Sequence, residues 1–454
     1  MSDTIAAIAT PPGQAGIGIV RLSGPQAMAV AARLFRPQNP RSLPFPSHRL
    51  LLGQIISPDN GQVIDEVLLS YMRAPHSYTR EDVVEINCHS GWAVLQKILN
   101  LVLQQGARLA LPGEFTQRAF LSGRIDLTQA EAVLEIIQSR SEAALRVATS
   151  HLTGGLGQTL AAQRQNILQL LAQVEADLDF GDEVPDLAYP DLLPPLQAIS
   201  RDINALCQSY GQGRILREGL QVVLAGRPNV GKSSLLNQLL QTERALVTDI
   251  PGTTRDVIAE QVIIHGVPIC LLDTAGLRQT EDKVEVLGVE RTRQQLAHAD
   301  LVLYLIDASQ PWQPDDASQL EGLAGQRVLL VLNKCDLPLV ISKDALAAAW
   351  PHQVVALSAL TGAGVPELRQ AIFQTAVNQD PPAAQIVTQA RHYQHLAQCR
   401  EHLRQAQAHI TAGLPPELIA LELGAAAQAL GAILGLEIGE EVLERIFSQF
   451  CLGK

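Results

Sequence analysis

The feature that most constrains this chain is the segment GRPNVGKSS at residues 226–234. An apolar run, LQVVLA, precedes it, and SLLNQLL follows with helical spacing. The pattern G-x-x-x-x-G-K-S between a strand and a helix predicts a phosphate-binding loop. Its glycines let backbone N–H groups approach phosphate oxygens, and the N-terminus of the following helix favours their negative charge. We therefore expect Lys232 to contact the β and γ phosphates and Ser233 to bind Mg²⁺.

Three further motifs follow in order and predict specificity for guanine. DTAG ends an apolar run, which places Asp273 to hold the metal through water and Gly276 beside the γ phosphate. NKCD ends another run, and the carboxylate of Asp336 can accept two hydrogen bonds from N1–H and the 2-amino group of guanine. Adenine offers neither donor in that arrangement. SAL, at residues 358–360, ends the last apolar run and can complete the base pocket, so the site is predicted to select GTP over ATP.

The pattern of apolar residues divides the chain into four stretches. Residues 1–118 alternate short apolar runs with Gly and Pro, which predicts an α+β domain. Over 119–215 apolar residues recur at helical intervals, and Thr128 has capping-box spacing to a glutamate three residues on. Strand-loop-helix repeats over 216–378 predict a parallel sheet buried on both faces, and 379–454 returns to helix. The simplest arrangement is one helical domain interrupted by the nucleotide domain.

Individual elements are predicted from the apolar runs and their periodicity. Strands are expected at Thr4–Ala9, Ile17–Leu22, Val67–Met72 and Val83–Ile86, and helices at Trp92–Leu103 and Leu192–Tyr210. The closely spaced glycines of Thr10–Gly24 are interpreted as the turns of a hairpin. They are not a dinucleotide fingerprint, because no clean βαβ opening precedes them.

Composition and charge narrow the class of protein. The 454 residues suggest two or three domains, and 47% hydrophobic with 18% charged residues is typical of a soluble globular protein. The formal net charge of −12 does not indicate a nucleic-acid partner, so any RNA must be bound through a local patch or with another protein. Neither a run of eighteen uncharged apolar residues nor the basic start of a signal peptide is present, so we expect a cytoplasmic protein without a membrane partner.

The four nucleotide motifs resemble those of TRAFAC-class GTPases, the Ras-like translation-factor group. In Ras-like members a glutamine that positions the attacking water follows DTAG, but Leu277 stands there in this chain. An apolar side chain cannot orient water, so that role must be filled from elsewhere. Asn229 and the segment TDIPGTTRD, residues 248–256, resemble the potassium-activated branch. The resemblance implies that Asn229 and switch-loop oxygens hold K⁺ against the phosphates; the alternative is that Asn229 only braces the loop.

Three other stretches extend the resemblance over the whole chain. They are APHSYTREDVVEINCHSG at 74–91, LPGEFTQRAFLSGRIDLTQAEAV at 111–133 and FCLGK at 450–454. Together with GRPNVGKSSLLN and TDIPGTTRDV they closely resemble the MnmE (TrmE) family of GTPases, which modify the wobble uridine of tRNA. The family's terminus usually reads Cys-Ile-Gly-Lys, and Leu452 conservatively replaces the isoleucine here.

This resemblance implies a multidomain α+β and α/β fold. Its parts are an N-terminal tetrahydrofolate-binding domain, similar to the glycine-cleavage T protein, an all-α helical domain and an inserted Ras-like P-loop G domain. The N-terminal domain is implied to form a homodimer. The implied reaction joins potassium-activated GTP hydrolysis to the addition of an aminomethyl or carboxymethylaminomethyl group to C5 of uridine 34 in tRNA. The implied partner is the flavoprotein MnmG, which carries FAD, in a heterotetramer or larger complex.

The resemblance also implies cofactors and their contacts. The cofactors are GTP, Mg²⁺, K⁺ and 5,10-methylene-tetrahydrofolate, of which 5-formyl-tetrahydrofolate is an analogue. Expected GTP contacts are Asn229, Val230, Gly231, Lys232, Ser233, Ser234, Thr248, Asp249, Ile250, Pro251, Gly252, Thr253, Thr254, Asp273, Thr274, Ala275, Gly276, Asn333, Lys334, Asp336, Ser358 and Ala359. Expected metal ligands are Ser233 and Thr254 for Mg²⁺, and Asn229, Thr248, Ile250 and Thr253 for K⁺. Expected folate contacts are Arg21, Glu85, Arg124 and Lys454.

Several implied roles have simpler alternatives. Glu285 is a catalytic candidate beside Lys232, because the family has a glutamate there thought to position water. Its segment, EDKVEVLG, would equally suit a charged, solvated switch. Cys451 either helps to pin the terminus as a small apolar residue or acts near folate and uridine as a proton donor or nucleophile. Each folate candidate, taken alone, is an ordinary surface ion-pair residue.

Two rival functions share part of this pattern. Ribosome-assembly GTPases also carry GRPNVGKS, a TRD-type switch and NKxD, but they usually add a KH-like module or a second G domain. The sequence has neither a GXXG loop in a basic context nor a second P-loop. The other rival is a one-carbon folate enzyme with a regulatory G domain and no RNA role. The lack of a basic patch favours it mildly, whereas the whole-chain resemblance argues against it.

Overall fold

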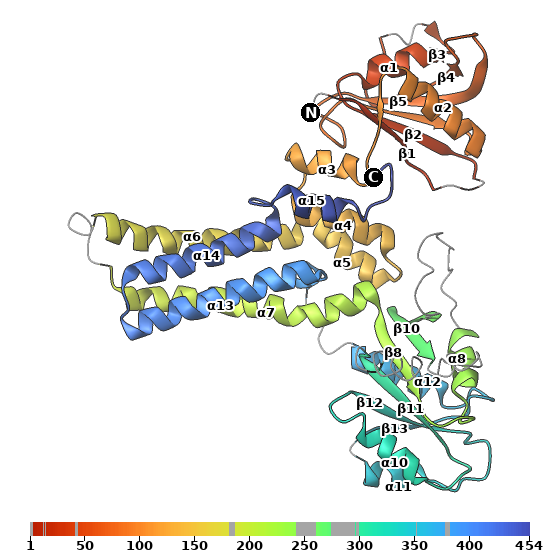
Figure 1. Cartoon of the computed structure of the whole chain (residues 1–454), viewed down its shortest axis with the longest axis vertical. Helices are drawn as coiled ribbons and strands as arrows, with labels where there is room; N and C mark the ends of the chain where they lie inside the picture. Colours follow the sequence, from red (N-terminus) through yellow and green to blue (C-terminus); the bar gives the residue numbers. More distant parts are fainter. Residues whose placement is uncertain are drawn as a thin grey trace, which may run out of the picture. The chain divides into compact units, whose positions relative to one another are not determined.

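A computed structural model describes residues 3–11, 13, 15–40, 44–180, 187–241, 260–273, 296, 299–350, 352–376 and 382–454 (Figure 1). The chain forms two compact units. The first contains Met1–Leu134, His151–Ala172 and Leu423–Lys454, and the second contains Glu135–Ser150 and Gln173–Glu422. The domain limits predicted from sequence, after residues 118, 215 and 378, stay a prediction.

The first unit is built on a seven-stranded sheet with the order β3-β4-β5-β6-β2-β1-β7. Only β1 and β7 pair in parallel; the other neighbours are antiparallel. The strands are β1 (Ile5–Ile8), β2 (Gly18–Ser23), β3 (Phe35–Pro37), β4 (Leu50–Ile56), β5 (Val63–Met72), β6 (Val83–Cys88) and β7 (Arg108–Leu109). Helices α1 (Ala27–Leu34) and α2 (Trp92–Gln104) bury their apolar side chains against one face of this sheet.

The predicted elements of this region are confirmed. Each of the four expected strands and the expected helix is present with ends shifted by a few residues. The glycine-rich stretch joins two paired strands, because Ile5 of β1 lies opposite Ser23 of β2 in an antiparallel ladder. The hairpin interpretation of Thr10–Gly24 is therefore correct, with residues 12 and 14 outside the described part.

Helices come directly after this sheet in the sequence, and further helices come near the C-terminal end of the chain. They are α3 (Glu114–Leu121), α4 (Leu127–Gln138), α5 (Glu142–Leu152), α6 (Gly155–Phe180), α14 (Pro416–Leu434) and α15 (Glu440–Phe447). Side chains of α4 and α15 share an apolar cluster with Phe450. Among the described helices, α14 has the length and composition to cross a membrane, and 56% of its apolar window is buried inside the protein, as in a core helix.

The capping box of α4 lies at a different pair from the predicted one. Asp126 Oδ1 accepts from the backbone N–H of Gln129 at 2.9 Å, and Gln129 Oε1 accepts from that of Asp126 at 3.0 Å. Thr128 instead donates its hydroxyl to Asp126 at 2.6 Å. An aspartate with a glutamine three residues on forms the same reciprocal cap as Ser/Thr with Glu, so the prediction at Thr128 was wrong.

The second unit contains a six-stranded sheet with the order β13-β12-β11-β8-β10-β9. Its strands are β8 (Leu220–Ala225), β9 (Glu260–Ile264), β10 (Val267–Asp273), β11 (Leu301–Asp307), β12 (Val328–Asn333) and β13 (Gln353–Ala356). All neighbours are parallel except β9 and β10. Strands such as β11 are buried along their whole length, as predicted for a sheet covered on both faces.

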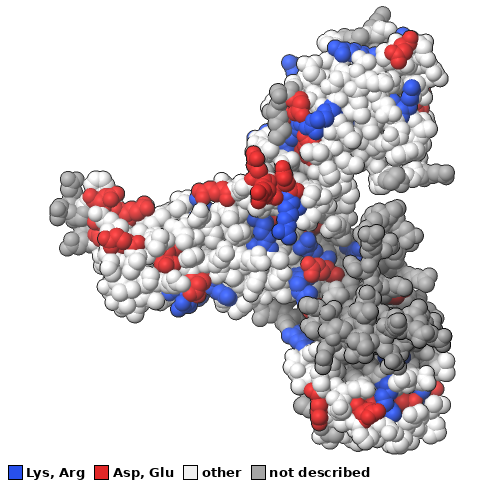
Figure 2. Space-filling view, in the orientation of Figure 1, with Lys and Arg blue, Asp and Glu red and all other residues white. Residues whose placement is uncertain are grey.

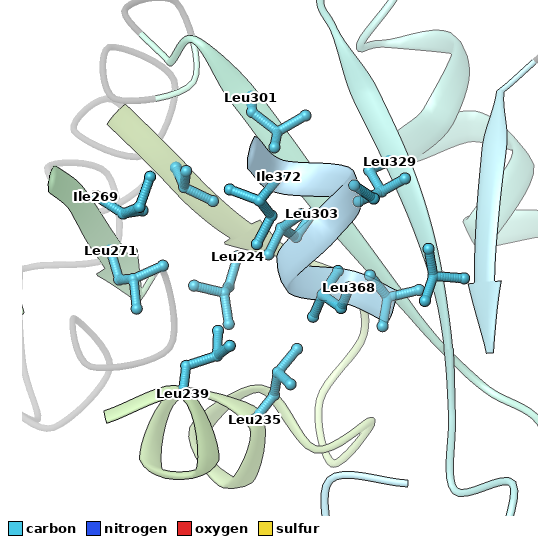
Figure 3. Close-up of a cluster of buried hydrophobic side chains, with 14 of the residues drawn as sticks. Leu224, Leu235, Leu239, Ile269, Leu271, Leu301, Leu303, Leu329, Leu368 and Ile372 are labelled. Atoms are coloured by element: carbon cyan, nitrogen blue, oxygen red, sulfur yellow. The ribbon is translucent and has the colours of Figure 1, made fainter. Parts of the chain in front are cut away.

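Helices cover both faces of this sheet. Figure 3 shows leucines of α8 (Lys232–Gln241) and α12 (Val365–Ala376) pointing into the core with the strand side chains. A second apolar cluster on the same sheet includes residues of α10 (Pro314–Glu321) and α11 (Lys343–Ala349). This is a doubly wound arrangement, in which ligands bind beyond the carboxyl ends of the parallel strands.

Two long helices run beside each other in the second unit. They are α7 (Leu193–Glu218), which follows the short 3₁₀ helix η2 (Tyr189–Leu192), and α13 (Ala390–Ala412), which follows η4 (Ala383–Gln385). The prediction ended the first of them at Tyr210, but α7 continues to Glu218. Gly213 within it allows close packing, because a Cβ there would lie 2.1 Å from Val387 O.

Candidate nucleotide and C-terminal sites

The P-loop approaches its neighbours too closely for side chains at two glycines. A Cβ at Gly226, where φ is 128°, would lie 2.4 Å from Leu305 O. A Cβ at Gly231, where φ is 99°, would lie 2.3 Å from Asn333 Nδ2. Only glycine fits either position. The backbone between β8 and α8 is thereby held in the form that a phosphate cradle requires.

Lys232 and Asn229 place polar groups at this loop. Lys232 is 8% exposed, and its Nζ donates to the carbonyls of Gly226 and Arg227 at 2.8 Å each. Its charge therefore lies within the loop. Asn229 is exposed and has a φ of 63°, a conformation that asparagine tolerates better than most residues. Ser233 is exposed at the start of α8.

Asn333 joins the loops that carry the predicted base contacts. It is 1% exposed, and its Nδ2 donates to Val230 O at 2.8 Å. Its Oδ1 accepts from the backbone N–H of Ala359 at 2.9 Å. Asp336 is exposed and so accessible to a base, whereas Ser358 is buried and accepts from Thr361 N at 3.2 Å. The structure thus brings the P-loop, NKCD and SAL together.

An ion pair between a buried aspartate and a partly exposed lysine, which the sequence did not indicate, lies at the same ends of the strands. Lys334 has a φ of 63°, and its Nζ lies 2.6 Å from Asp307 Oδ2. Burial opposes the ionisation of Asp307, but hydrogen bonds from Lys334 and Ser309 outweigh it and hold the pKa of Asp307 below its ordinary value. Asp307 ends β11, beside the ends of β8 and β12. Its place at the end of an apolar run was the sequence signal that could have indicated this residue.

The strand ends bring the nucleotide motifs to one edge. Strands β8, β10, β12 and β13 are parallel members of the sheet, so their carboxyl ends meet there, and Asp273 lies opposite Leu224. The side chain of Asp273 is not described. The other predicted contacts that lie outside the described residues are Thr248, Asp249, Ile250, Pro251, Gly252, Thr253, Thr254, Thr274, Ala275, Gly276 and Glu285.

The described residues fit a nucleotide phosphate with Mg²⁺. They provide a glycine cradle, one lysine and a serine hydroxyl at a helix start. No group of three or more His, Cys, Asp or Glu side chains within the described ranges could hold a metal. Mg²⁺ is commonly held by few protein ligands together with substrate phosphates and water.

Two of the predicted folate residues, Arg21 and Glu85, form an ion pair beside residues 450–454, here called the tail, and a third, Lys454, belongs to the tail. Arg21 lies on β2 opposite Glu85 on β6, and its Nε donates to Glu85 Oε1 at 2.8 Å. Its Nη1 donates to Gly453 O at 2.9 Å. A Cβ at Gly453, where φ is 86°, would lie 2.5 Å from Ile8 O. The tail is thus fitted closely against β1 and β2.

Two of the predicted folate residues, Arg21 and Arg124, lie close to aromatic rings. The Arg21 guanidinium lies 5.7 Å from the ring centre of Phe115, and that of Arg124 lies 4.8 Å from the ring centre of Tyr78. Phe115 and Tyr78 belong to one apolar cluster. The four predicted folate residues therefore lie in one compact unit, although the aromatic partners were not predicted.

Cys451 is exposed within the tail. Its backbone carbonyl accepts from the N–H of Gly113 and of Lys454, at 3.4 Å each. The apolar anchors of this segment are Phe447 and Phe450, whose rings lie 5.5 Å apart. The exposed thiol is not part of that apolar cluster, and both alternatives for Cys451 stay predictions.

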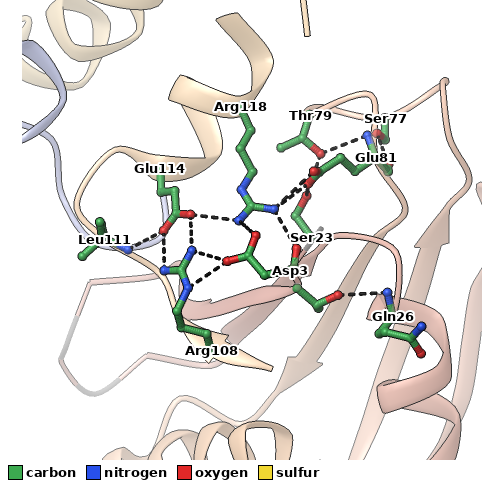
Figure 4. A network of polar contacts seen from close by, with 11 residues as sticks. Asp3, Ser23, Gln26, Ser77, Thr79, Glu81, Arg108, Leu111, Glu114 and Arg118 are labelled. Atoms are coloured by element: carbon green, nitrogen blue, oxygen red, sulfur yellow. Dashed lines mark hydrogen bonds and ion pairs between the residues drawn. The ribbon is translucent and has the colours of Figure 1, made fainter. Parts of the chain in front are cut away.

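A buried ion network holds α3 in place beside the tail (Figure 4). Arg118 is 2% exposed and donates to Asp3, Glu81 and Glu114. Arg108 joins the same network through Asp3 and Glu114. Burial opposes the ionisation of Glu114, but the two arginines lower its pKa overall. The network fixes the helix that carries Phe115.

Charged side chains of both signs are mixed on one face of the protein (Figure 2). On the face drawn in Figure 2, Lys and Arg side chains lie among Asp and Glu rather than in one large basic patch. This agrees with the formal net charge of −12.

Comparison with known proteins connects both sites to one family. The model of the MnmE helical domain matches residues 127–451, and that of the GTP-binding protein TrmE N-terminus matches residues 4–124. The tRNA modification GTPases MnmE of Moorella thermoacetica and Chloroflexus aurantiacus are 47% and 48% identical, and the alignments cover all of both chains. The solved G domain of the T. maritima FeoB iron transporter is 29% identical, covers 35% of this chain and 98% of its own, and has a TM-score of 0.28.

These matches confirm the fold class predicted from sequence, an N-terminal α+β domain with a helical domain and a P-loop G domain. Full-length identity of 44–48% to named GTPases identifies a GTP hydrolase that takes guanine nucleotide and acts in tRNA modification. This chain therefore belongs to the MnmE family of tRNA modification GTPases.

Proposed function

We propose that this chain is a potassium-activated GTPase that modifies wobble uridine 34 of tRNA in the cytoplasm, as a homodimer with the flavoprotein MnmG. The modification adds an aminomethyl or carboxymethylaminomethyl group to C5, with a one-carbon tetrahydrofolate as donor. Family membership supports the tRNA reaction. The observation that carries the proposal is the contact of Gly453 O with Arg21 at 2.9 Å, because it joins the tail to the predicted folate residues.

In the nucleotide site, Lys232 would contact the β and γ phosphates, while Ser233 and Thr254 would bind Mg²⁺. Asn229, with Thr248, Ile250 and Thr253, would hold K⁺ where other GTPases use an arginine. Exposure of Asn229 beside the P-loop supports its part. Leu277 cannot position water, so Glu285 is proposed for that role.

Dependence on K⁺ is tested by comparing GTP hydrolysis in KCl and NaCl at equal ionic strength. We expect faster hydrolysis in KCl for the parent chain and a loss of that difference in Asn229→Ala. Arg36→Ala, in β3 of the other unit, serves as a control. Equal rates of the parent chain in the two salts exclude the K⁺ role.

In the tail site, Arg21 and Arg124 would pair with the glutamate-tail carboxylates of the folate, and Glu85 would accept from the amino and N–H groups of its pterin ring. Lys454 would add a further contact. The Arg21 and Glu85 side chains are 18% and 22% exposed, so both remain partly accessible. Ligand binding would exchange part of their mutual ion pair for contacts to the folate.

Cys451 is proposed to take part in the modification chemistry itself. Cys451→Ser should keep GTP hydrolysis and folate binding, measured with 5-formyl-tetrahydrofolate, while losing tRNA modification. Full modification by this variant refutes the role, since serine keeps the size of the side chain but not the nucleophilicity of a thiol.

The two sites are proposed to act together through G-domain movement. GTP binding would bring the two G domains of the homodimer together across their switch regions, and hydrolysis would let them separate. Hydrolysis, rather than GTP binding alone, would drive product formation. Modification at full rate with a non-hydrolysable GTP analogue contradicts this mechanism.

The function as a whole is tested by mass spectrometry of tRNA nucleosides from cells that lack this protein. We expect loss of 5-substituted uridine at position 34 and its recovery when the gene is restored. Unchanged uridine-34 chemistry together with defective ribosomal subunits would instead support a ribosome-assembly GTPase.

A further inference from the structure

One arginine of the helical segment reaches the sheet of the nucleotide domain. Arg140 lies between α4 and α5, and its Nη1 donates to Gln261 Oε1 on β9. Both residues belong to the second compact unit. Arg140 precedes β8 by about eighty residues in the sequence, so the contact joins separate parts of the chain.

Gln261 continues the contact into the sheet. It lies opposite Cys270 in the antiparallel ladder, and its Nε2 is 3.6 Å from Cys270 Sγ. Cys270 Sγ donates to Glu218 O, at the end of α7, at 3.4 Å. Burial raises the pKa of Cys270, so this thiol stays protonated and acts as the donor. A chain of polar contacts therefore runs from Arg140 through β9 and β10 to α7.

The β9–β10 hairpin lies between two predicted nucleotide contacts. In the sequence it begins six residues after Thr254, and β10 ends at Asp273. Among the described strands, β9 is the last of the sheet and pairs with β10 on one side only. Since an edge strand has no second ladder to break, it can shift at smaller cost than a central strand.

The other attachments of the G domain hold its central strands. Arg214 of α7 pairs with Asp300, and Asp300 Oδ2 accepts from the N–H of Gln221 at 2.9 Å. The segment that leaves the G domain packs on α7 as well, because Val387 N donates to Ser209 Oγ at 3.0 Å. These contacts hold β8, the residue before β11 and the segment after the G domain against α7. Arg140 instead contacts the edge strand.

We propose that Arg140 senses the position of the β9–β10 hairpin and couples the nucleotide state to the α4–α5 segment. Arg140 touches no nucleotide and is a positioning residue for the coupling. Its side chain is exposed, so water competes for the hydrogen bond to Gln261, and the contact can break and re-form. The proposal uses the GTPase activity of the family and is independent of the folate and K⁺ roles proposed above.

The test is hydrogen exchange of the full chain with GDP or with a non-hydrolysable GTP analogue, read on peptides that cover residues 139–150. The parent chain should show protection in this segment that differs between the two states by about 5-fold, the lower range of allosteric coupling. Arg140→Ala and Gln261→Ala should each remove the difference. The double variant should do no more than either single change, because both act through one contact.

Matched variants separate coupling from folding. Arg146→Ala removes an exposed arginine from α5 and should leave the difference intact. Gln261→Glu keeps an acceptor for Arg140 and should retain it too. GTP hydrolysis should stay within about twofold in Arg140→Ala, since the residue is outside the catalytic loop. A nucleotide-dependent difference that persists in Arg140→Ala, or that is absent from the parent chain, overturns the proposal.

Discussion

The nucleotide site at the carboxyl ends of the parallel strands, here called the nucleotide edge, and the tail site are assembled from the sequence in opposite ways. At the nucleotide edge each motif directly follows a strand of one parallel sheet, so chain direction alone brings the motifs together. At the tail site Arg21 meets Gly453, 432 residues away, through contacts that only the folded unit creates. The first site is a property of local pattern and topology, and the second is a property of long-range packing.

This difference predicts how each site responds to change. The nucleotide edge depends on polar side chains at defined loop positions, so single polar substitutions there should have large and local effects. The tail site depends on backbone fit around glycine as much as on its charged residues, so a small added methyl group should damage it.

The largest expected effect is at Lys232. Lys232→Ala removes a positive charge at the phosphates and should lower kcat for GTP hydrolysis by about 100-fold or more, measured by phosphate release. Lys343→Ala, an exposed lysine at the start of α11, is the control. Folate affinity should stay unchanged in both variants. A Lys232→Ala rate within threefold of the parent chain would remove this lysine from the mechanism.

Next in size is the base carboxylate. Under the proposed contact with guanine, Asp336→Asn would lose two charge-assisted hydrogen bonds and should weaken GTP binding by about 100-fold in calorimetric titration. Xanthosine triphosphate should regain affinity, because an asparagine amide can donate to the oxygen that replaces the 2-amino group. Asp344→Asn, on α11, should change neither affinity. Weaker GTP binding without any gain for the xanthine nucleotide would point to a misfolded loop instead.

A smaller effect is expected from the backbone of the tail. Gly453→Ala adds a Cβ 2.5 Å from Ile8 O at a φ of 86°. The strain of a left-handed alanine, about 1–2 kcal/mol, should lower affinity for 5-formyl-tetrahydrofolate by about tenfold while leaving GTP hydrolysis unaltered. Gly439→Ala is the matched control, since nothing lies within 4 Å of its added Cβ. Equal folate affinity in the two variants would separate tail docking from folate binding.

The smallest effect concerns Asp307 and Lys334. The pKa of Asp307 in the folded protein lies below its ordinary value of 3.8. Its carboxylate therefore stabilises the fold at pH values above 3.8, and this stabilisation is lost as the pH falls through the lowered pKa. Asp307→Asn should lower the free energy of unfolding by about 1 kcal/mol at pH 7, and the difference should shrink below pH 4. Calorimetry of the full chain, with the G-domain transition identified by its response to GDP, measures it. A difference that persists unchanged at low pH would assign the loss to packing rather than charge.

Sequence reasoning predicted the elements best where one physical cause decides the pattern. Uniform apolar runs gave the buried strands, and strand-loop-helix context gave the P-loop. Prediction was least accurate at helix ends, where local patterns are weakest. The helix predicted to end at Tyr210 continues to Glu218, and Asp126, rather than Thr128, supplies the cap of α4.

The candidate sites divide in the same way. Asn333 and Asp336 follow from their motif, whereas Asp307 is a polar residue at one strand end among many. The pairing of Arg21 with Gly453 has no local signal, and it was not predicted; family resemblance named only Arg21 and Lys454, as folate contacts. Arg140 had no signal at all, because its partner belongs to a strand that lies 121 residues further along the chain.

The docked tail also has a consequence for protein synthesis. The ribosome makes Gly453 long after β1 and β2, so the sheet can fold while its last contact is still absent. The strands β1 and β2 are therefore made long before the tail residues that contact them through Arg21 and Ile8. Under the proposed folate role, a nascent chain could complete the folate site only after residues 450–454 had been added.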